Sequence, residues 1–211
     1  MKRNYNDFYI DDNKYEVKDS FIAVTEEIDD NFNGSIADVG CAIGAFPLYL
    51  SNRFSSANIV GIEYSDSLLL HAKKNLPNLN LIYGDVNDKH SIDQKFDVIT
   101  VMGVLSIFDN YEQILSNIIS WLKPKGKIIM HNMISDYDID VFVKYAPSSS
   151  HYNKDNMESG WNIISKKSLS LVCKNNSAKL VKVKSFNISV DMEKNNEDLL
   201  RSWTELDTFS N

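Results

Sequence analysis

Between residues 35 and 134 the chain alternates short apolar runs with segments of helical periodicity, and this alternation constrains the fold more than any other feature. Apolar runs of strand length with no polar face are typical of parallel strands covered on both sides. The expected strands are 35–40, 58–64, 80–86, 95–104 and 127–134, and the expected helices are 45–54, 65–76 and 110–122. Strands that alternate with helices predict an α/β fold with a doubly wound, mostly parallel sheet and helices on both faces.

The charge and cysteine content exclude several classes of protein. Lys and Arg number 22 against 29 Asp and Glu, so the net charge is −7 and the basic surface of a nucleic-acid-binding protein is missing. Two cysteines, Cys41 and Cys173, are too few for a disulfide framework or a Cys-based zinc site. No apolar run approaches the length of a membrane span, and the basic N-terminal tip lacks the apolar stretch of a secretory signal. We therefore expect a cytoplasmic location and no membrane partner.

The run ADVGCAIGA (37–45) joins the first expected strand to the first expected helix. Gly40 ends the strand and Gly44 opens the helix, and glycines let a backbone bend sharply and approach a ligand closely. In doubly wound sheets the ligand lies beyond the carboxyl ends of the strands. The run is either a tight strand-to-helix turn or a cofactor-binding loop.

Two classes of cofactor use such a loop. A dinucleotide site requires G-x-G-x-x-G/A, but Ala42 occupies the second glycine position and Gly44 comes one position too early. S-adenosylmethionine sites follow [D/E]-x-G-x-G-x-G, which Asp38, Gly40, Ala42 and Gly44 fit with one substitution. Asp38 can attract the ammonium group of that cofactor, whereas an acid has no use beside a pyrophosphate. An NAD-linked oxidoreductase is therefore the less favoured alternative.

Two further acids follow expected strands. Glu63 ends the second strand, where a carboxylate can accept hydrogen bonds from both ribose hydroxyls, in NAD sites as well. Asp85 follows the third strand, where it can accept a bond from the adenine amino group while Tyr64 and Val86 flank the ring. Each acid alone could be a solvated loop carboxylate, but three acids at three strand ends favour a nucleoside cofactor.

Taken in order, these pieces resemble the class I S-adenosylmethionine-dependent methyltransferases of the small-molecule type. The matching runs, within about residues 30–135, are ADVGCAIG, GIEYSDSLL, YGDV, FDVITVMGVLSIF and LKPKGKIIM. The resemblance implies S-adenosylmethionine as cofactor, S-adenosylhomocysteine as product, and a seven-stranded Rossmann-like sheet whose last strand is antiparallel. The C-terminal sequence offers no convincing seventh strand, so we expect the terminal antiparallel strand to be short or missing.

The resemblance also assigns cofactor contacts. It places the loop residues and the two residues after the fourth strand beside the methionine portion, Glu63 on the ribose and Asp85 on the adenine. The full set expected to bind the cofactor is Asp38, Gly40, Cys41, Ala42, Gly44, Glu63, Tyr64, Asp85, Val86, Met102 and Gly103.

The chain is expected to form a single domain with four parts. These are an N-terminal cap over 1–34, a cofactor-binding core over 35–134, a lid or acceptor insertion over 135–164, and a C-terminal helix and edge strand over 165–211. Helices are expected around 21–30 and over 165–175, and a strand over 178–190. Long insertions such as 135–164 commonly carry function.

The acceptor side is less defined. If the nucleophile is a hydroxyl, a general base helps, and His131 at the end of the fifth strand is the first choice, followed by His151. His131 could instead be a partly buried histidine bonded to backbone. Tyr9, Tyr145 and Trp161 are the aromatic residues expected to contact the acceptor, although each could simply pack the cap.

Several methyltransferase subclasses do not fit. Metal-dependent catechol-type enzymes need an acid after the fourth strand and a later Asp-Asn pair, where this chain has Met102-Gly103 and His131-Asn132, so no metal is expected. DNA amino-methylating enzymes need D/N-P-P-Y/F, where this chain has MGVLS. We expect a hydroxyl or amine of a small metabolite as acceptor, and the run 160–170 is similar to methyltransferases of glycan or secondary-metabolite pathways. The alternative is a catalytically silent nucleoside-binding regulatory module. Either would be a monomer or homodimer.

Overall fold

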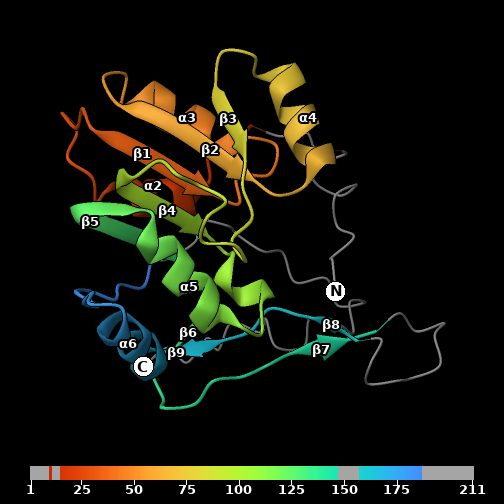
Figure 1. Cartoon of the computed structure of the whole chain (residues 1–211), viewed down its shortest axis with the longest axis vertical. Coiled ribbons are helices and arrows are strands. Elements are labelled where there is room, and N and C mark those ends of the chain that lie inside the picture. Colours follow the sequence, from red (N-terminus) through yellow and green to blue (C-terminus); the bar gives the residue numbers. More distant parts are fainter. Residues whose placement is uncertain (1–9, 11–14, 147–156, 187–211) are drawn as a thin grey trace, which may run out of the picture.

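A five-stranded parallel sheet forms the centre of the computed structural model, which describes residues 10, 15–146 and 157–186 (Figure 1). Its strands are β1 (Ser35–Val39), β2 (Asn58–Glu63), β3 (Asn80–Tyr83), β4 (Phe96–Met102) and β5 (Leu122–His131). Their spatial order is β3-β2-β1-β4-β5, and every neighbouring pair is parallel. The predicted doubly wound α/β sheet is therefore confirmed, and the strand order reverses between β1 and β4.

Helices cover both faces of the sheet. They are α2 (Asp19–Thr25), α3 (Ala45–Arg53), α4 (Asp66–Asn75), α5 (Tyr111–Ser120) and α6 (Lys166–Asn175). Apolar residues of α2 and α3 pack with Ile36 of β1, whereas those of α5 and α6 pack with Ala37. Since successive strand residues face opposite sides, the two clusters lie on opposite faces. Of the helices described, none combines the length and apolarity that crossing a bilayer requires.

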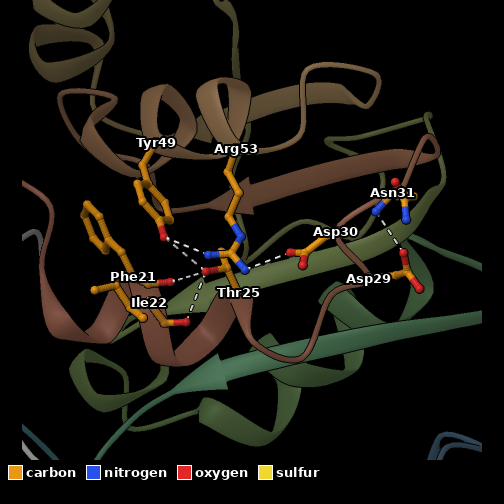
Figure 2. Close-up of polar contacts among 8 residues, drawn as sticks. All are labelled: Phe21, Ile22, Thr25, Asp29, Asp30, Asn31, Tyr49 and Arg53. Atoms are coloured by element: carbon orange, nitrogen blue, oxygen red, sulfur yellow. Dashed lines mark hydrogen bonds and ion pairs between the residues drawn. The ribbon is translucent and has the colours of Figure 1, made fainter.

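Helix α2 is fastened to α3 by a small polar network (Figure 2). The buried hydroxyl of Thr25 donates to the carbonyl of Phe21 at 2.8 Å and lies 3.3 Å from the hydroxyl of Tyr49 on α3. At the far end of α3, Arg53 pairs with Asp30 at 3.0 Å. These contacts hold α2 against α3, which covers one face of the sheet. The helix expected around 21–30 begins earlier and ends at Thr25.

Strands β3 and β5 differ most from the prediction. Strand β3 ends at Tyr83 rather than at residue 86, because the Asp85 carboxylate accepts a 2.8 Å bond from the amide of Asn87 and turns the chain. Residues 123–126, which separate the expected helix 110–122 from the expected strand 127–134, lie inside β5 as a bulge. Phe96 pairs with Leu122 and Val98 with Lys127, so five residue steps on β5 oppose two on β4.

The strand expected over 178–190 is wrong for residues 178–186, and residues 187–190 lie outside the described chain. Instead of joining the sheet, Lys182 and Lys184 form ion pairs of 2.7 Å and 2.6 Å with Glu27 and Glu26, which follow α2. Within the residues described, the central sheet accordingly has no antiparallel strand.

The segment 135–164 carries short strands of its own. Two of them, β6 (Ile134–Ser135) and β9 (Ile164–Ser165), pair in parallel, while β7 (Lys144–Tyr145) and β8 (Glu158–Ser159) pair antiparallel. The fully buried Asn162 fixes the segment to the turn after β4: its amide donates to Ser106 at 2.7 Å and its side chain donates to the Phe108 carbonyl at 3.1 Å. Ser106 belongs to the 3-10 helix η1 (Leu105–Ile107).

The absence of a side chain at Gly61 of β2 makes room for the loop after β1. A Cβ there would lie 2.5 Å from Leu81 Cδ2, 2.9 Å from Cys41 Sγ and 3.1 Å from Pro47 Cγ. We expect Gly61→Ala to lower the free energy of unfolding by about 1–3 kcal/mol, as overpacking does elsewhere. Urea denaturation followed by circular dichroism measures this.

The matched control is Leu70→Ala, since Leu70 on α4 is 71% exposed. We expect it to change stability by less than about 0.5 kcal/mol. A Gly61→Ala variant as stable as the wild type would mean that the loop does not depend on this close approach.

Candidate functional site

The loop 40–44 lies where the carboxyl ends of β1, β2 and β4 meet, beside the point at which the strand order reverses (Figure 1). Its backbone is left-handed at Gly40 (φ 76°), Ala42 (φ 49°) and Gly44 (φ 87°). This conformation is easy for glycine and costly for other residues. The geometry thus explains why a third glycine would suit the position that Ala42 occupies.

Glu63 ties this loop to the end of β2. The amide of Ala42 donates to Glu63 Oε2 and the amide of Ser65 donates to Oε1, both at 2.8 Å. The amides of Gly40 and Cys41 both donate to the Ile62 carbonyl, at 2.9 Å and 3.1 Å. A carboxylate has about four lone-pair sites, so Glu63 retains acceptor capacity for ligand hydroxyls after binding two amides.

Cys41 has a structural place in the loop. Its side chain is buried, and its sulfur packs toward Gly61 of β2. Burial raises the pKa of the thiol, and the neighbouring Asp38 and Glu63 raise it further. Because the thiolate is the reactive form, this cysteine is suited to packing rather than to nucleophilic attack.

Asp38 is the most deeply buried acid of the site, with 1% of its surface exposed. Its Oδ1 lies 2.9 Å from the hydroxyl of Thr100 on β4. Burial raises the pKa of Asp38 to about 8; the bond from Thr100 lowers it and the charge of Glu63 raises it. Thr100 was not predicted as a site residue, because its register with Asp38 is visible only in the structure.

The residues expected around the adenine lie after β2 and β3. The rings of Tyr64 and Tyr83 are 5.8 Å apart and tilted by 40°, so Tyr83, which was not predicted, lies beside Tyr64. Asp85 uses Oδ1 for both of its bonds with Asn87, leaving Oδ2 as an acceptor as far as the described residues go. Val86 is buried and packs with the core cluster.

The end of β4 borders open space. Gly103 has a left-handed backbone (φ 76°), and a Cβ placed on it would meet no atom within 4 Å. Its amide donates to the carbonyl of His131 at 2.7 Å, which joins the ends of β4 and β5. Met102 precedes it and is half-buried. This edge has room for a ligand to lie directly against the backbone.

The predicted acceptor residues are only partly brought together. The ring of the half-buried His131 lies 5.4 Å from that of Phe186, and burial lowers the pKa of His131. Tyr145 donates to Glu158 Oε2 at 2.8 Å, and Trp161 is 54% exposed. Tyr9 and His151 lie outside the described residues.

A polar pair next to His131 was also missed. Ser106 donates to Asn132 Oδ1 at 3.0 Å, and Asn132 Nδ2 is enclosed and has no hydrogen-bond partner among the residues that the structure describes. Two surface hollows lie away from the loop: one of about 420 Å³ between α5 and α6, and one of about 220 Å³ between α2 and residues 184–186. Across the described parts of the chain, no three His, Cys, Asp or Glu side chains are grouped to hold a metal ion.

Comparison with known proteins finds similarity to methyltransferases. Residues 36–126 match the family described as "Methyltransferase domain". Trans-aconitate 2-methyltransferase of Variovorax paradoxus is 30% identical over 91 residues, which cover 43% of this chain and 35% of that protein. Malonyl-[acyl-carrier protein] O-methyltransferase 2 of Ilyobacter polytropus is 28% identical over 155 residues, covering 72% of this chain and 56% of that protein. The chain thus spans between about a third and somewhat over half of these curated relatives.

Among solved structures, the PH0226 protein from Pyrococcus horikoshii is similar with a TM-score of 0.57. The two are 17% identical, and the match covers 83% of this chain and 90% of that one. At this identity the likeness supports the fold alone.

The raised pKa of Asp38 predicts a pH-dependent stability. An acid whose pKa is higher in the folded than in the unfolded state stabilises the fold only while it is protonated. The folded state therefore loses stability as pH rises from about 4 to about 8. Asn cannot ionise and can donate to Thr100 as the protonated acid does. We expect the stability of Asp38→Asn relative to wild type to increase between pH 5 and pH 8, by up to several kcal/mol at about 1.4 kcal/mol per pKa unit.

Asp97 on the same pair of strands is a control of opposite sign. Its bonds from Lys123 and from the amide and hydroxyl of Ser35 lower its pKa to about 2, so its stabilisation is present above about pH 4 and is lost as pH falls. We expect Asp97→Asn to be destabilised at pH 7 and less so near pH 3. Denaturant unfolding at several pH values measures the stability of each variant relative to wild type. If the two relative stabilities changed with pH in the same direction, this would contradict a buried, protonated Asp38.

Proposed function

The chain belongs to the class I S-adenosylmethionine-dependent methyltransferase family, and from this we propose that it transfers a methyl group from S-adenosylmethionine to a hydroxyl or amine of a small metabolite. The observation that carries the proposal is the convergence of three acids at one edge of the sheet. Asp38, Glu63 and Asp85 lie at or just beyond the ends of β1, β2 and β3. A nucleoside that carries a positive charge can interact with all three acids.

Each part of the cofactor has a place in this arrangement. Glu63 accepts from the ribose hydroxyls with lone pairs that the amides of Ala42 and Ser65 leave over. Asp85 accepts from the adenine amino group beside the ring of Tyr64, and the open space at Gly103 admits the methionine portion. The bound cofactor supplies a methyl group activated by its sulfonium charge. The task of the protein is to align that methyl group with the nucleophile and exclude water.

His131 is the residue we propose to take the proton of the acceptor. It ends β5, opposite Met102 of β4 in register, which puts it on the same edge as the open space at Gly103. Because burial lowers its pKa, the imidazole is neutral at pH 7 and can accept a proton from a hydroxyl or an ammonium group. Tyr145 and Trp161 of the segment 135–164 are proposed acceptor contacts, with Tyr9 and His151 of the chain outside the described residues.

The acceptor is proposed to be a sugar or a precursor of a secondary metabolite. The named relatives act on trans-aconitate and on a malonyl-carrier protein, both of which present oxygen nucleophiles. This supports an oxygen acceptor on a small group.

Cofactor binding tests the assignment. We expect calorimetric titration to show micromolar binding of S-adenosylmethionine and S-adenosylhomocysteine and none of NAD. Removing an acceptor with Asp85→Ala should weaken S-adenosylhomocysteine by about tenfold or more, since a hydrogen bond to a charged group contributes about 1.5–3 kcal/mol.

The matched control is Asp93→Ala, an exposed carboxylate later in the same connection between β3 and β4. Binding of NAD alone would contradict the proposed function, as would equal weakening by both variants. Binding of the sulfur nucleosides without turnover of any acceptor would favour the regulatory nucleoside-binding protein instead.

The role of His131 is tested separately from cofactor binding. With a panel of hydroxyl- and amine-bearing metabolites, we expect His131→Ala to lower kcat by about 100-fold or more, while S-adenosylhomocysteine affinity stays within about twofold. The acidic limb of the wild-type pH profile should lie below about pH 6.5, the ordinary value for histidine, because burial lowers the pKa.

His71→Ala serves as control, since His71 lies on α4, away from this edge. Its Nε2 is 2.8 Å from Asn75 Nδ2. Wild-type turnover in His131→Ala would assign the histidine to packing against Phe186.

A further inference from the structure

Residues 178–186, which we call the strap, follow helix α6 (Figure 1). Alternate residues of the strap face the rest of the protein: Lys182 and Lys184 reach the turn after α2, whereas Val181 and Val183 are 84% and 40% exposed. This period of two indicates an extended chain. The strap nevertheless pairs with no strand of the described sheet. Side-chain contacts, rather than a backbone ladder, therefore determine where it lies.

The turn after α2 joins the strap to β5, the edge strand of the sheet. The side chain of Glu27 pairs with Lys182 at 2.7 Å, and its backbone carbonyl accepts a bond from Lys127 of β5. Lys127 and His131 are four residues apart on β5, and the strap has the same spacing between Lys182 and Phe186. The rings of His131 and Phe186 meet there, with centroids 5.4 Å apart and planes tilted by 54°. The strap thus follows β5 toward the carboxyl edge of the sheet.

His131 faces the side of the sheet that α2 covers. Ile129, two residues earlier on β5, packs with the apolar cluster of α2 and α3, as does Met102, which is in register with His131 on β4. Phe186 lies against the imidazole and also borders the hollow of about 220 Å³ between α2 and residues 184–186. Because of this hollow, packing alone does not enclose the phenyl ring. Its place depends on how the strap is held.

Two ion pairs hold the strap just before Phe186. Lys182 pairs with Glu27 at 2.7 Å and Lys184 with Glu26 at 2.6 Å. The four side chains are between 35% and 57% exposed, so each pair contributes only about 0–1 kcal/mol. The two acids are adjacent, however, so both pairs fasten one short stretch of the strap to one turn. Two attachments at alternate residues fix the direction of the strap better than one, and Phe186 follows two residues after the second.

The charged groups nearest to His131 along the surrounding elements are engaged with one another or border the hollow. They are Lys127 on β5, Lys182 and Lys184 on the strap, Glu26 and Glu27 after α2, and Asp19 at the start of α2. From β4, Met102 and Gly103 bring no charge. Burial, rather than a neighbouring charge, lowers the pKa of His131. An apolar cover such as Phe186 acts in this direction, because it disfavours the charged form of the imidazole.

We propose that Phe186 is a positioning residue for the proposed base, and that the strap holds its ring against the imidazole of His131. This rests on the proposed function, which takes His131 to receive the proton of the acceptor. The phenyl ring excludes water from one side of the imidazole and limits its rotation. The unprotonated ring is thereby kept ready at the edge where β4 and β5 end.

The experiment follows the titration of His131 by nuclear magnetic resonance in the full chain. The chain has four histidines, and the imidazole resonance that is lost in His131→Ala belongs to His131. We expect Phe186→Ala to raise the pKa of His131 toward the ordinary value of about 6.5, and Phe186→Leu, which keeps an apolar cover, to raise it less. Circular dichroism checks that each variant is folded. With an acceptor that the chain turns over, the acidic limb of the kcat profile should move by the same amount as the titration.

A double variant, Lys182→Ala with Lys184→Ala, tests the strap without changing either ring, and it decides the question if Phe186→Ala does not fold. We expect it to raise the pKa of His131 in the same direction but by less. The matched control is Lys174→Ala with Lys179→Ala, which removes the same charge from exposed lysines on α6 and at the start of the strap. We expect this control to leave the titration unchanged.

An unchanged titration of His131 in a folded Phe186→Ala variant, or equal shifts in the two double lysine variants, would overturn this proposal and leave the proposed function standing. Wild-type turnover in His131→Ala would overturn the role of the histidine as base, and this proposal with it. Failure of S-adenosylhomocysteine to bind the wild-type chain would overturn the proposed function itself, whatever the titration shows.

Discussion

The carboxylate of Glu63 holds together the two chain segments on which the site depends. One of its oxygens binds the loop after β1 through the amide of Ala42, and the other binds the turn after β2 through the amide of Ser65. Two more loop amides bind the neighbouring Ile62 carbonyl. A loop with three left-handed residues in five positions would otherwise have many conformations, so this side chain determines where the loop and helix α3 begin.

The same interaction puts a second negative charge close to the buried Asp38. That charge adds to burial in raising the pKa of Asp38. In the proposed function, a sulfonium nucleoside is recognised by the charge of Asp38 near the loop and by hydrogen bonds at Glu63 and Asp85.

Much of the fold could be predicted from the sequence because buried parallel strands leave a strong local signal. Strands β1, β2 and β4 read as apolar runs. The acids Asp38, Glu63 and Asp85 lie at or just beyond the ends of β1, β2 and β3, so a parallel sheet places them at one edge whatever the details of packing. The pattern over 178–186 looked like an edge strand, but Lys182 and Lys184 pair with Glu27 and Glu26, more than 150 residues away. No local pattern reports such a contact.

In the site, too, the positions of residues could be predicted from the sequence, but their long-range contacts could not. Glu63 was predicted as a ribose ligand from its position, whereas its bonds to the loop amides arise from backbone geometry that the sequence does not contain. Thr100 and Asn162 were missed because a single polar residue in an apolar context has no periodicity. Their partners, Asp38 and the carbonyls of η1 and its flank, become visible only when distant strands are brought together.

Hydrogen–deuterium exchange with and without S-adenosylhomocysteine tests the central claim most directly, since it reports where a ligand lies without assuming any residue's role. We expect added protection at residues 40–44, 64–65, 85–87 and 103, and little change in the hollow between α5 and α6. Protection centred on that hollow, or none at the carboxyl edge of the sheet despite saturating ligand, would contradict it.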